Sequence, residues 1–483
     1  MPIPPLGRSL VLFVACAVFF QLILFFKSTL SPSSHSPRHR SDYDSESHGS
    51  FAPHSGARDP ARNRHPTVPL SLKDLHVLDG LADTIAKTES QRVFGDKEIG
   101  RIPGTSITKN PTLVKQIRDQ IHCWTTHGSW QREEKQFKWM QHRGDARFTK
   151  CDKSFVKSLG RVGHGHYLGD YDLGRDQLLV REAVKYRWVP DEKICGPGSG
   201  PGYIGLSDAR AQYKHQPTKG EFCKAIGQRS MLMVGDLTQY QLHDVVLSAF
   251  ESSLVCYGEL GCLHHSAHGL CPGVALKYAR NDLLSVPWAV NPEEEEYPSA
   301  STVEQTWGTS DMLEKFKVLI LNRGLIWRPD EVFLSELVFT MKHLWKYYPD
   351  TLVIYRATHP IAPNCTQFKD QGEDGAIADS KFGTQSSVEG TTLRRPLQHP
   401  PERQDFHQDK PEYRPTLADI QRQNRMAKTI VEAAGGIFLD TEAMFAMRPD
   451  GRMGDGDCAR FCAPGPLDAY GDLLYNTFRI LRV

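Results

Sequence analysis

The stretch Met231-Leu232-Met233-Val234-Gly235-Asp236 decides the fold, because a short apolar run ends abruptly at a glycine and a carboxylate. Three later runs follow the same pattern, each closed by a polar residue: 318–321 before Asn322, 352–355 before Arg356, and 437–439 before Asp440. Continuous apolar runs of this length are typical of strands covered on both faces of a parallel sheet.

The segments between these runs have helical spacing. Apolar stripes run through residues 242–250, through 332–344 before Pro349, and through 417–431 before Gly435-Gly436. Thr416 is a plausible N-cap of the third helix. Alternating strands and helices predict an α/β fold with a doubly wound, mostly parallel sheet. Its functional side chains should gather where the carboxyl ends of the strands point.

The N-terminus begins with an apolar segment, residues 10–26, interrupted by Gln21 and closed by Lys27. At about 1.5 Å per residue it just spans a thin bilayer, and no small-x-small cleavage site follows it. We predict a signal-anchor transmembrane helix within residues 1–27, with a cleaved signal peptide as the alternative. The flanking basic residues do not decide its orientation.

Cysteine usage points to an oxidising compartment. Ten of the eleven cysteines lie beyond the apolar segment, an even number that suggests up to five disulfides of undetermined pairing. Asn364-Cys365-Thr366 fits the N-glycosylation pattern. We therefore expect a single-pass type II protein of the Golgi or an adjoining secretory membrane, with its body in the lumen. The net charge of +1 gives no sign of a nucleic-acid partner.

Composition divides the 483 residues into four parts. Residues 28–70 are rich in Ser, Pro, His and Arg, so they should form a disordered stem. We expect an N-terminal lumenal lobe with disulfides over 71–228 and the α/β domain over 229–483. A second polar stretch at about 367–415 is predicted to be a flexible insertion in that domain.

The second half of the chain resembles a known family. Val234-Gly235-Asp236 occupies the place of the GDS block of SGNH-type esterases. The segment 457–468, Asp-Cys-Ala-Arg-Phe-Cys-Ala-Pro-Gly-Pro-Leu-Asp, looks like the DCxHWCLPGxxD block of the trichome-birefringence-like and PC-esterase family. Segments 321–327 and 355–360 are similar to that family's NTGHWW and FRTxSP segments, in the same order.

The resemblance implies an SGNH-like fold and a Golgi enzyme that moves or removes O-acetyl groups on polysaccharides without a cofactor. Such an enzyme uses a serine nucleophile, a histidine base and an aspartate, because a hydroxyl needs an adjacent base to attack an ester. Here the nucleophile position is Leu237 and the base position is Arg460, whose guanidinium cannot accept a proton. Of the three catalytic positions, Asp457 alone is retained.

Other residues of the matched blocks imply contacts to the ligand. Candidate glycan or oxyanion contacts are Gly235, Asp236, Gln241, Asn322, Gly324 and Arg460. Asp457 and Arg460, three residues apart, could instead form a salt bridge in the former catalytic corner. Arg460 is otherwise suited to bidentate recognition of an acidic glycan.

Two substitutes for the missing pair are conceivable. Thr238 follows one residue after the nucleophile position, although the turn of about 100° per helical residue aims it elsewhere. A base could come from His243, His359 or the cluster His264, His265 and His268. That cluster lies among Cys256, Cys262 and Cys271, a set that could hold zinc, but wide cysteine spacing in an oxidising lumen favours disulfides and no metal.

Two main functional hypotheses follow, and a third is kept beside them. The first is a degenerate family member that has lost catalysis and binds glycan or assists a catalytic relative. The second is an active acyl-transfer enzyme with a rearranged triad, recognisable by a Thr238 hydroxyl within about 3.2 Å of a histidine nitrogen. A stem-anchored scaffold without a ligand is the third and weakest.

Overall fold

A computed structural model of the chain describes the following residues: 72–95, 100–132, 182–197, 211–252, 261–265, 270–286, 303–359, 417–454, 457–463 and 465–481. The apolar segment at 10–26, the stem, Asn364 and the insertion at about 367–415 lie outside them. Within the described ranges, no helix is both long and apolar enough to cross a bilayer. Residues Pro69–Val483 form one compact unit.

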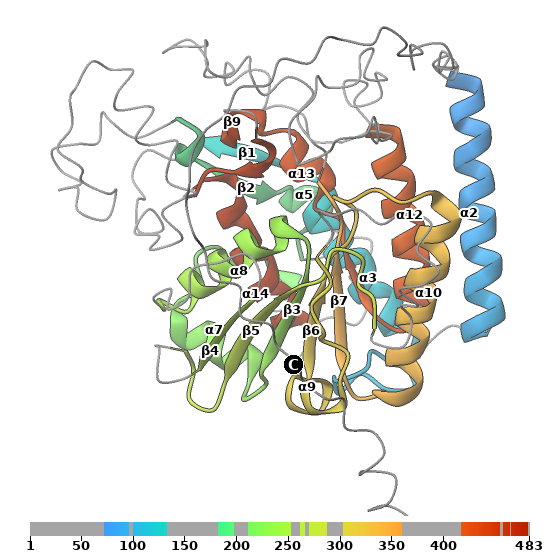
Figure 1. Cartoon of the computed structure of the whole chain (residues 1–483). Helices are drawn as coiled ribbons and strands as arrows, with labels where there is room; N and C mark the ends of the chain where they lie inside the picture. The colour runs from blue at the N-terminus through green and yellow to red at the C-terminus, as the bar shows by residue number, and fades with distance from the viewer. Residues whose placement is uncertain are drawn as a thin grey trace, which may run out of the picture. The chain divides into compact units, whose positions relative to one another are not determined.

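A six-stranded mixed sheet is the centre of this unit (Figure 1). Its strands lie in the order β4-β5-β3-β6-β7-β8, and all neighbours are parallel except β4 and β5. Their bounds are β3 Met231–Gly235, β4 Gly261–His265, β5 Ala275–Arg280, β6 Val318–Leu321, β7 Leu352–Arg356 and β8 Ile437–Leu439. The predicted α/β fold with a mostly parallel sheet is therefore confirmed.

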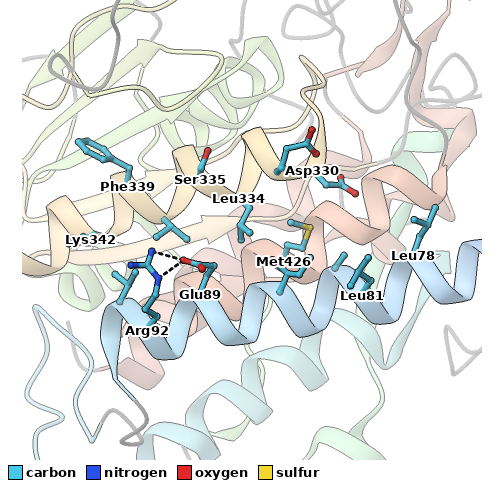
Figure 2. A pocket seen from close by; sticks show the side chains of 15 residues that line it. Leu78, Leu81, Glu89, Arg92, Asp330, Leu334, Ser335, Phe339, Lys342 and Met426 are labelled. Atoms are coloured by element: carbon cyan, nitrogen blue, oxygen red, sulfur yellow. Dashed lines mark hydrogen bonds and ion pairs between the residues drawn. The ribbon is translucent and has the colours of Figure 1, made fainter.

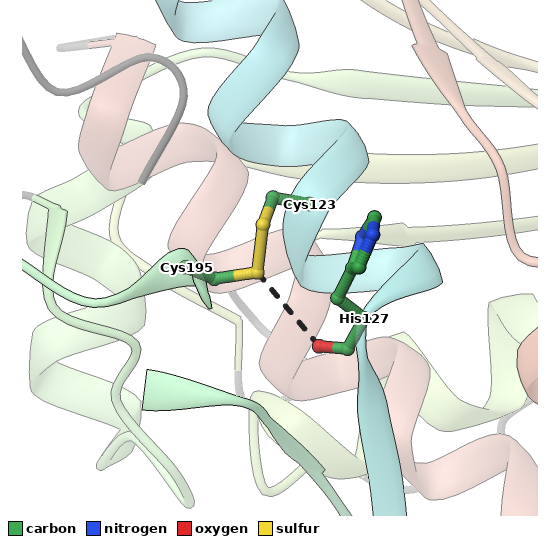
Figure 3. Close-up of side chains that lie close together, drawn as sticks. All are labelled: Cys123, His127 and Cys195. Atoms are coloured by element: carbon green, nitrogen blue, oxygen red, sulfur yellow. Dashed lines mark hydrogen bonds between the residues drawn. A yellow bond between two sulfur atoms is a disulfide. The ribbon is translucent and has the colours of Figure 1, made fainter. Parts of the chain in front are cut away.

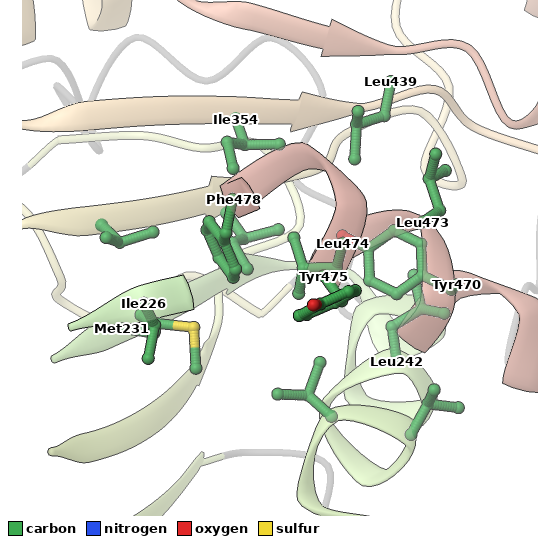
Figure 4. Packing of buried hydrophobic residues seen from close by; sticks show 14 of the residues in the cluster. Ile226, Met231, Leu242, Ile354, Leu439, Tyr470, Leu473, Leu474, Tyr475 and Phe478 are labelled. Atoms are coloured by element: carbon green, nitrogen blue, oxygen red, sulfur yellow. The ribbon is translucent and has the colours of Figure 1, made fainter. Parts of the chain in front are cut away.

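Helices cover both faces of the sheet, as its apolar strands require. One face packs on α3, α7, α8 and α14, where Phe478 and Leu474 of α14 cover Ile354 and Met231 of the strands (Figure 4). The other face packs on α9, α10 and α12. The bounds are α3 Pro111–Thr126, α7 Lys219–Ile226, α8 Leu237–Ala249, α9 Ser310–Lys315, α10 Asp330–Tyr347, α12 Leu417–Ala433 and α14 Ala469–Leu481. Helix α2, Leu72–Phe94, packs outside α10 and α12.

Two small two-stranded antiparallel sheets complete the unit. Strand β1, Gly128–Arg132, pairs with β2, Tyr186–Pro190, and β9, Arg452–Gly454, pairs with β10, Asp457–Phe461. The short helical segments are η5 Glu182–Lys185, α5 Glu192–Cys195, α13 Glu442–Ala446, η9 Pro449–Gly451 and η10 Pro466–Asp468.

The N-terminal elements share the core of the sheet domain. Trp130 of β1 donates its indole N–H to the carbonyl of Met444, and Arg118 of α3 donates to the carbonyls of Glu432 and Gly436. Disulfides join Cys123 to Cys195 and Cys223 to Cys271, so the expectation of disulfide bonds is confirmed. Cys262 and Cys462 are disulfide-bonded as well.

Candidate functional site

Strands β3 and β6 end side by side at a topological switch point. The helix after β3, α8, packs on one face of the sheet, and the helix after β6, α10, packs on the other. The connections after β3 and β6 therefore leave the sheet toward opposite faces, and α/β proteins commonly place their sites beside such a point. The side chains that follow these strands form the candidate site.

Asp236 is the N-cap of α8 and is fully buried. Its Oδ1 accepts from the backbone N–H of Thr238 at 2.9 Å and from the Thr238 hydroxyl at 2.6 Å. Its Oδ2 accepts from the backbone N–H of Leu325 at 3.3 Å. The carboxylate thus fixes the start of the helix and the turn after β6, as a cap does.

The two residues after Asp236 are buried in the first turn of α8. Leu237 stands at the nucleophile position and is 6% exposed. The Thr238 hydroxyl donates to Asp236 and accepts from Nη2 of Arg356 at 2.8 Å. Among the described residues, the two hydrogen-bond partners of this hydroxyl are Asp236 and Arg356, and neither is a histidine. The hydroxyl therefore links a carboxylate to a guanidinium.

Arg356, the last residue of β7, places a fully buried cation at this edge. Its Nε donates to the side chain of Gln239 at 3.1 Å, and its Nη1 donates to the carbonyl of Ala357 at 2.9 Å. Burial lowers the pKa of the guanidinium, and the nearby Asp236 charge opposes that shift. A buried charge is tolerated when it is paired and hydrogen-bonded in this way.

His359 lies next to Arg356 and is 3% exposed. Its Nδ1 is 3.2 Å from Nη1 of Arg356, and its Nε2 is 3.3 Å from the carbonyl of Ala459. Burial, with the charges of Arg452 and Arg356, holds the pKa of the imidazole well below its usual value. The neutral ring therefore accepts from the guanidinium and donates to the carbonyl, so both nitrogens are engaged.

The remaining glycines and amides of the matched segments have packing roles in the described structure. A Cβ on Gly235 would lie 2.8 Å from the carbonyl oxygen of Asn322. Gly324 has φ of +140°, and a Cβ there would lie 2.4 Å from Oγ1 of Thr358. Asn322 is fully buried, and its Nδ2 donates to Oγ1 of Thr358 at 3.3 Å. Gly235 leaves room for the backbone of Asn322, and Gly324 leaves room for the side chain of Thr358 at a positive φ that favours glycine.

Strand β10 is held against α8 by Gln241. The amide of Gln241 donates to the carbonyl of Phe461 at 2.6 Å and accepts from its N–H at 3.0 Å. Asp457 begins β10, and its side chain lies outside the described part of the structure. Arg460 is half-buried on the same strand. The salt bridge between Asp457 and Arg460 stays a prediction.

Glu442 is an ionisable group at this edge that the sequence did not single out. It follows β8 at the start of α13, is 8% exposed, and accepts from Nδ2 of Asn424 at 2.8 Å. The same amide donates to the carbonyl of Thr358, which connects Glu442 to the end of β7. Burial and the charge of Asp440 raise the pKa of Glu442 to about 7. The sequence signal that could have pointed to Glu442 was its place among the polar residues that follow the apolar run at 437–439.

His243 and one cysteine–histidine group are further candidates whose side chains the structure describes. His243 is buried in α8 and stacks on Tyr240, with ring centroids 5.9 Å apart. The side chains of His264, His265 and His268 lie outside the described residues. Cys123, His127 and Cys195 come together, but the two sulfurs form a disulfide and are not free to bind a metal (Figure 3).

No protein-family model matches the chain, and no curated protein sequence matches it.

Proposed function

We propose that this chain is a degenerate SGNH-like relative of the polysaccharide O-acetyltransferases and acetylesterases, which binds glycan or assists a catalytic relative without catalysing acyl transfer. One observation carries the proposal. Thr238, the nearest substitute for the missing serine in sequence, is 2% exposed, and its hydroxyl is hydrogen-bonded to a carboxylate and a guanidinium.

The arrangement argues against nucleophilic attack for two reasons. A nucleophilic hydroxyl must reach the substrate and pass its proton to a base near neutral pKa. Thr238 is enclosed by the first turn of α8, and its acceptor is the helix-capping carboxylate of Asp236. His359, one of the candidate bases, has both ring nitrogens engaged in hydrogen bonds.

The binding half of the proposal rests on Arg460 and on the resemblance of the 457–468 block. Among the candidate binding residues whose side chains the structure describes, Arg460 is half-buried while Asp236, Gln241 and Asn322 are buried. A guanidinium at the base position could hold a carboxylate or hydroxyl of a glycan. The disulfides support a lumenal, secretory-pathway setting.

A rearranged acyltransferase is the second candidate, and one distance favours it. The 2.6 Å contact between Oγ1 of Thr238 and Asp236 could draw off the hydroxyl proton, while Arg356 at 2.8 Å would stabilise the resulting alkoxide. This mechanism requires an opening that exposes Thr238.

The test compares acetyl release and glycan binding by the full-length chain. Acetyl release from acetylated oligosaccharides and from an activated ester should equal that of the Thr238→Val variant. Binding of acidic oligosaccharides should weaken about tenfold in Arg460→Ala and stay unchanged in the exposed-site control Arg101→Ala. Turnover that Thr238→Val abolishes would establish the enzyme instead, and absent binding would leave only a scaffold.

A further inference from the structure

An apolar groove of about 560 Å³ runs between α2 and α10, with Met426 of α12 among its lining residues (Figure 2). Leu78, Leu81 and Ile85 of α2 line it and are 37%, 54% and 41% exposed. Phe339 of α10 also lines it and is 40% exposed. Contiguous exposed apolar side chains of this kind mark an interaction surface.

The groove has the geometry of half a helix bundle. In Figure 2, α2 and α10 run alongside each other in the same direction, with Leu78 and Asp330 toward one end and Arg92 toward the other. Two helices that present apolar side chains to a shared groove can bury them against a second such pair. A second copy of the chain supplies that pair when a two-fold axis relates the copies.

The charges on α10 favour the same occupant. Glu331 and Lys342 are exposed, line the groove, and make no ion pair in the part of the chain that the structure describes. They are eleven residues apart, so they lie on one face of the helix, about 16 Å from each other. In an antiparallel pair of α10 helices, Glu331 of each copy faces Lys342 of the other.

We propose that this groove is the interface of an antiparallel homodimer, in which α2 and α10 of two copies form a four-helix bundle. The apolar side chains of the groove fill the centre, and the two Glu331–Lys342 pairs set the antiparallel direction. This surface lies on α2 and α10, so the inference does not rest on the proposed function.

Charge reversal in differently tagged, co-expressed full-length copies tests the proposal. Glu331→Lys in both copies, or Lys342→Glu in both copies, places like charges together at both ends of the bundle. A Glu331→Lys copy paired with a Lys342→Glu copy restores two opposite-charge pairs. We expect wild-type copies to co-purify, each matched pair to associate about tenfold more weakly, and the mixed pair to recover.

Two further readings strengthen the experiment. High salt should reduce the difference between matched and mixed pairs, because these charges are exposed. Leu81→Asp should abolish association in every combination. The proposal is overturned if wild-type copies do not associate. Equal association of matched and mixed pairs would also overturn it.

Discussion

Arg356 holds the polar network at the carboxyl edge of the sheet together, since it bonds Thr238, Gln239 and His359 from one buried guanidinium. Replacing it with methionine keeps most of the aliphatic stem but removes the guanidinium, which leaves the buried carboxylate of Asp236 without the nearby cation. We predict that Arg356→Met lowers the free energy of unfolding by about 3–5 kcal/mol. Urea denaturation measures this change.

Arg101→Met is the matched control, because Arg101 is exposed and its replacement should stay within about 0.5 kcal/mol of wild type. If Arg356→Met lowered the free energy of unfolding as little as the control does, the guanidinium would not be what stabilises this network. Sequence alone could locate Arg356 after an apolar run, but not its contact with Thr238, which joins residues 118 apart in the chain.

Glu442 should give the protein a measurable pH dependence. Its pKa is about 7 in the folded state against 4.5 normally, so the folded state binds more protons between these values. Stability contributed by this group therefore falls as the pH rises through that window. The difference amounts to about 3 kcal/mol at most.

The Glu442→Gln variant isolates this effect, because Asn424 can still donate to the amide oxygen of glutamine. Between pH 5 and pH 8, the free energy of unfolding should fall more in the wild type than in the variant. The comparison cancels the pH dependence that other groups contribute to both proteins. His122 is one such group, since burial lowers its pKa to about 4. Parallel pH profiles for the two proteins would refute the assignment.

Among the secondary-structure elements, the turn after β6 depends most strictly on one residue. Gly324 has φ of +140° and lies against Thr358, whose hydroxyl donates to the carbonyl of Arg323 at 2.6 Å. We predict that Gly324→Ala destabilises the protein by about 2 kcal/mol or more, through backbone strain and the clash with Thr358. Thermal or urea unfolding provides the measurement.

Gly220 is the contrasting position. It lies in α7 with open space around it, so Gly220→Ala should stabilise the protein by about 0.5–1 kcal/mol. Equal effects of the two substitutions would show that the Gly324 turn is not constrained as described.

The four strands with uninterrupted apolar runs, β3, β6, β7 and β8, were all predictable from sequence, as were α8, α10 and α12. Strand β5 was not predicted, because Lys277 and Arg280 break its apolar pattern. Strand β4 pairs with β5 alone at the sheet edge, where a continuous apolar run is not required. Periodicity detects strands buried on both faces and misses the partly exposed edge.

Across the whole molecule, the compact unit Pro69–Val483 should unfold as one body. Helix α3 belongs to the segment predicted as a separate lobe, yet Arg118 bonds backbone carbonyls next to β8. In amide hydrogen exchange, the most protected amides of α3 and of β6 should both open with a free energy equal to the global free energy of unfolding. Markedly weaker protection throughout α3 would identify an independent lobe.

The position of the candidate site followed from the sequence, because strand ends of a parallel sheet meet at one edge. Its chemistry did not, because Asp236, Thr238, Arg356 and His359 come together only through the parallel pairing of β3, β6 and β7. That pairing brings Asp236, predicted as a ligand contact, and Thr238, weighed as a substitute nucleophile, into hydrogen-bond contact with each other and, through Thr238, with Arg356.

The most direct test of the central claim asks whether Thr238 can ever carry an acyl group. The full-length chain is incubated with an excess of an activated acetyl ester, quenched within seconds, and analysed by intact-protein and peptide mass spectrometry, beside Thr238→Val. We predict no acetyl adduct on Thr238, because its hydroxyl is buried between Asp236 and Arg356. A near-stoichiometric adduct on Thr238 that the variant lacks would contradict the account and establish a catalytic nucleophile.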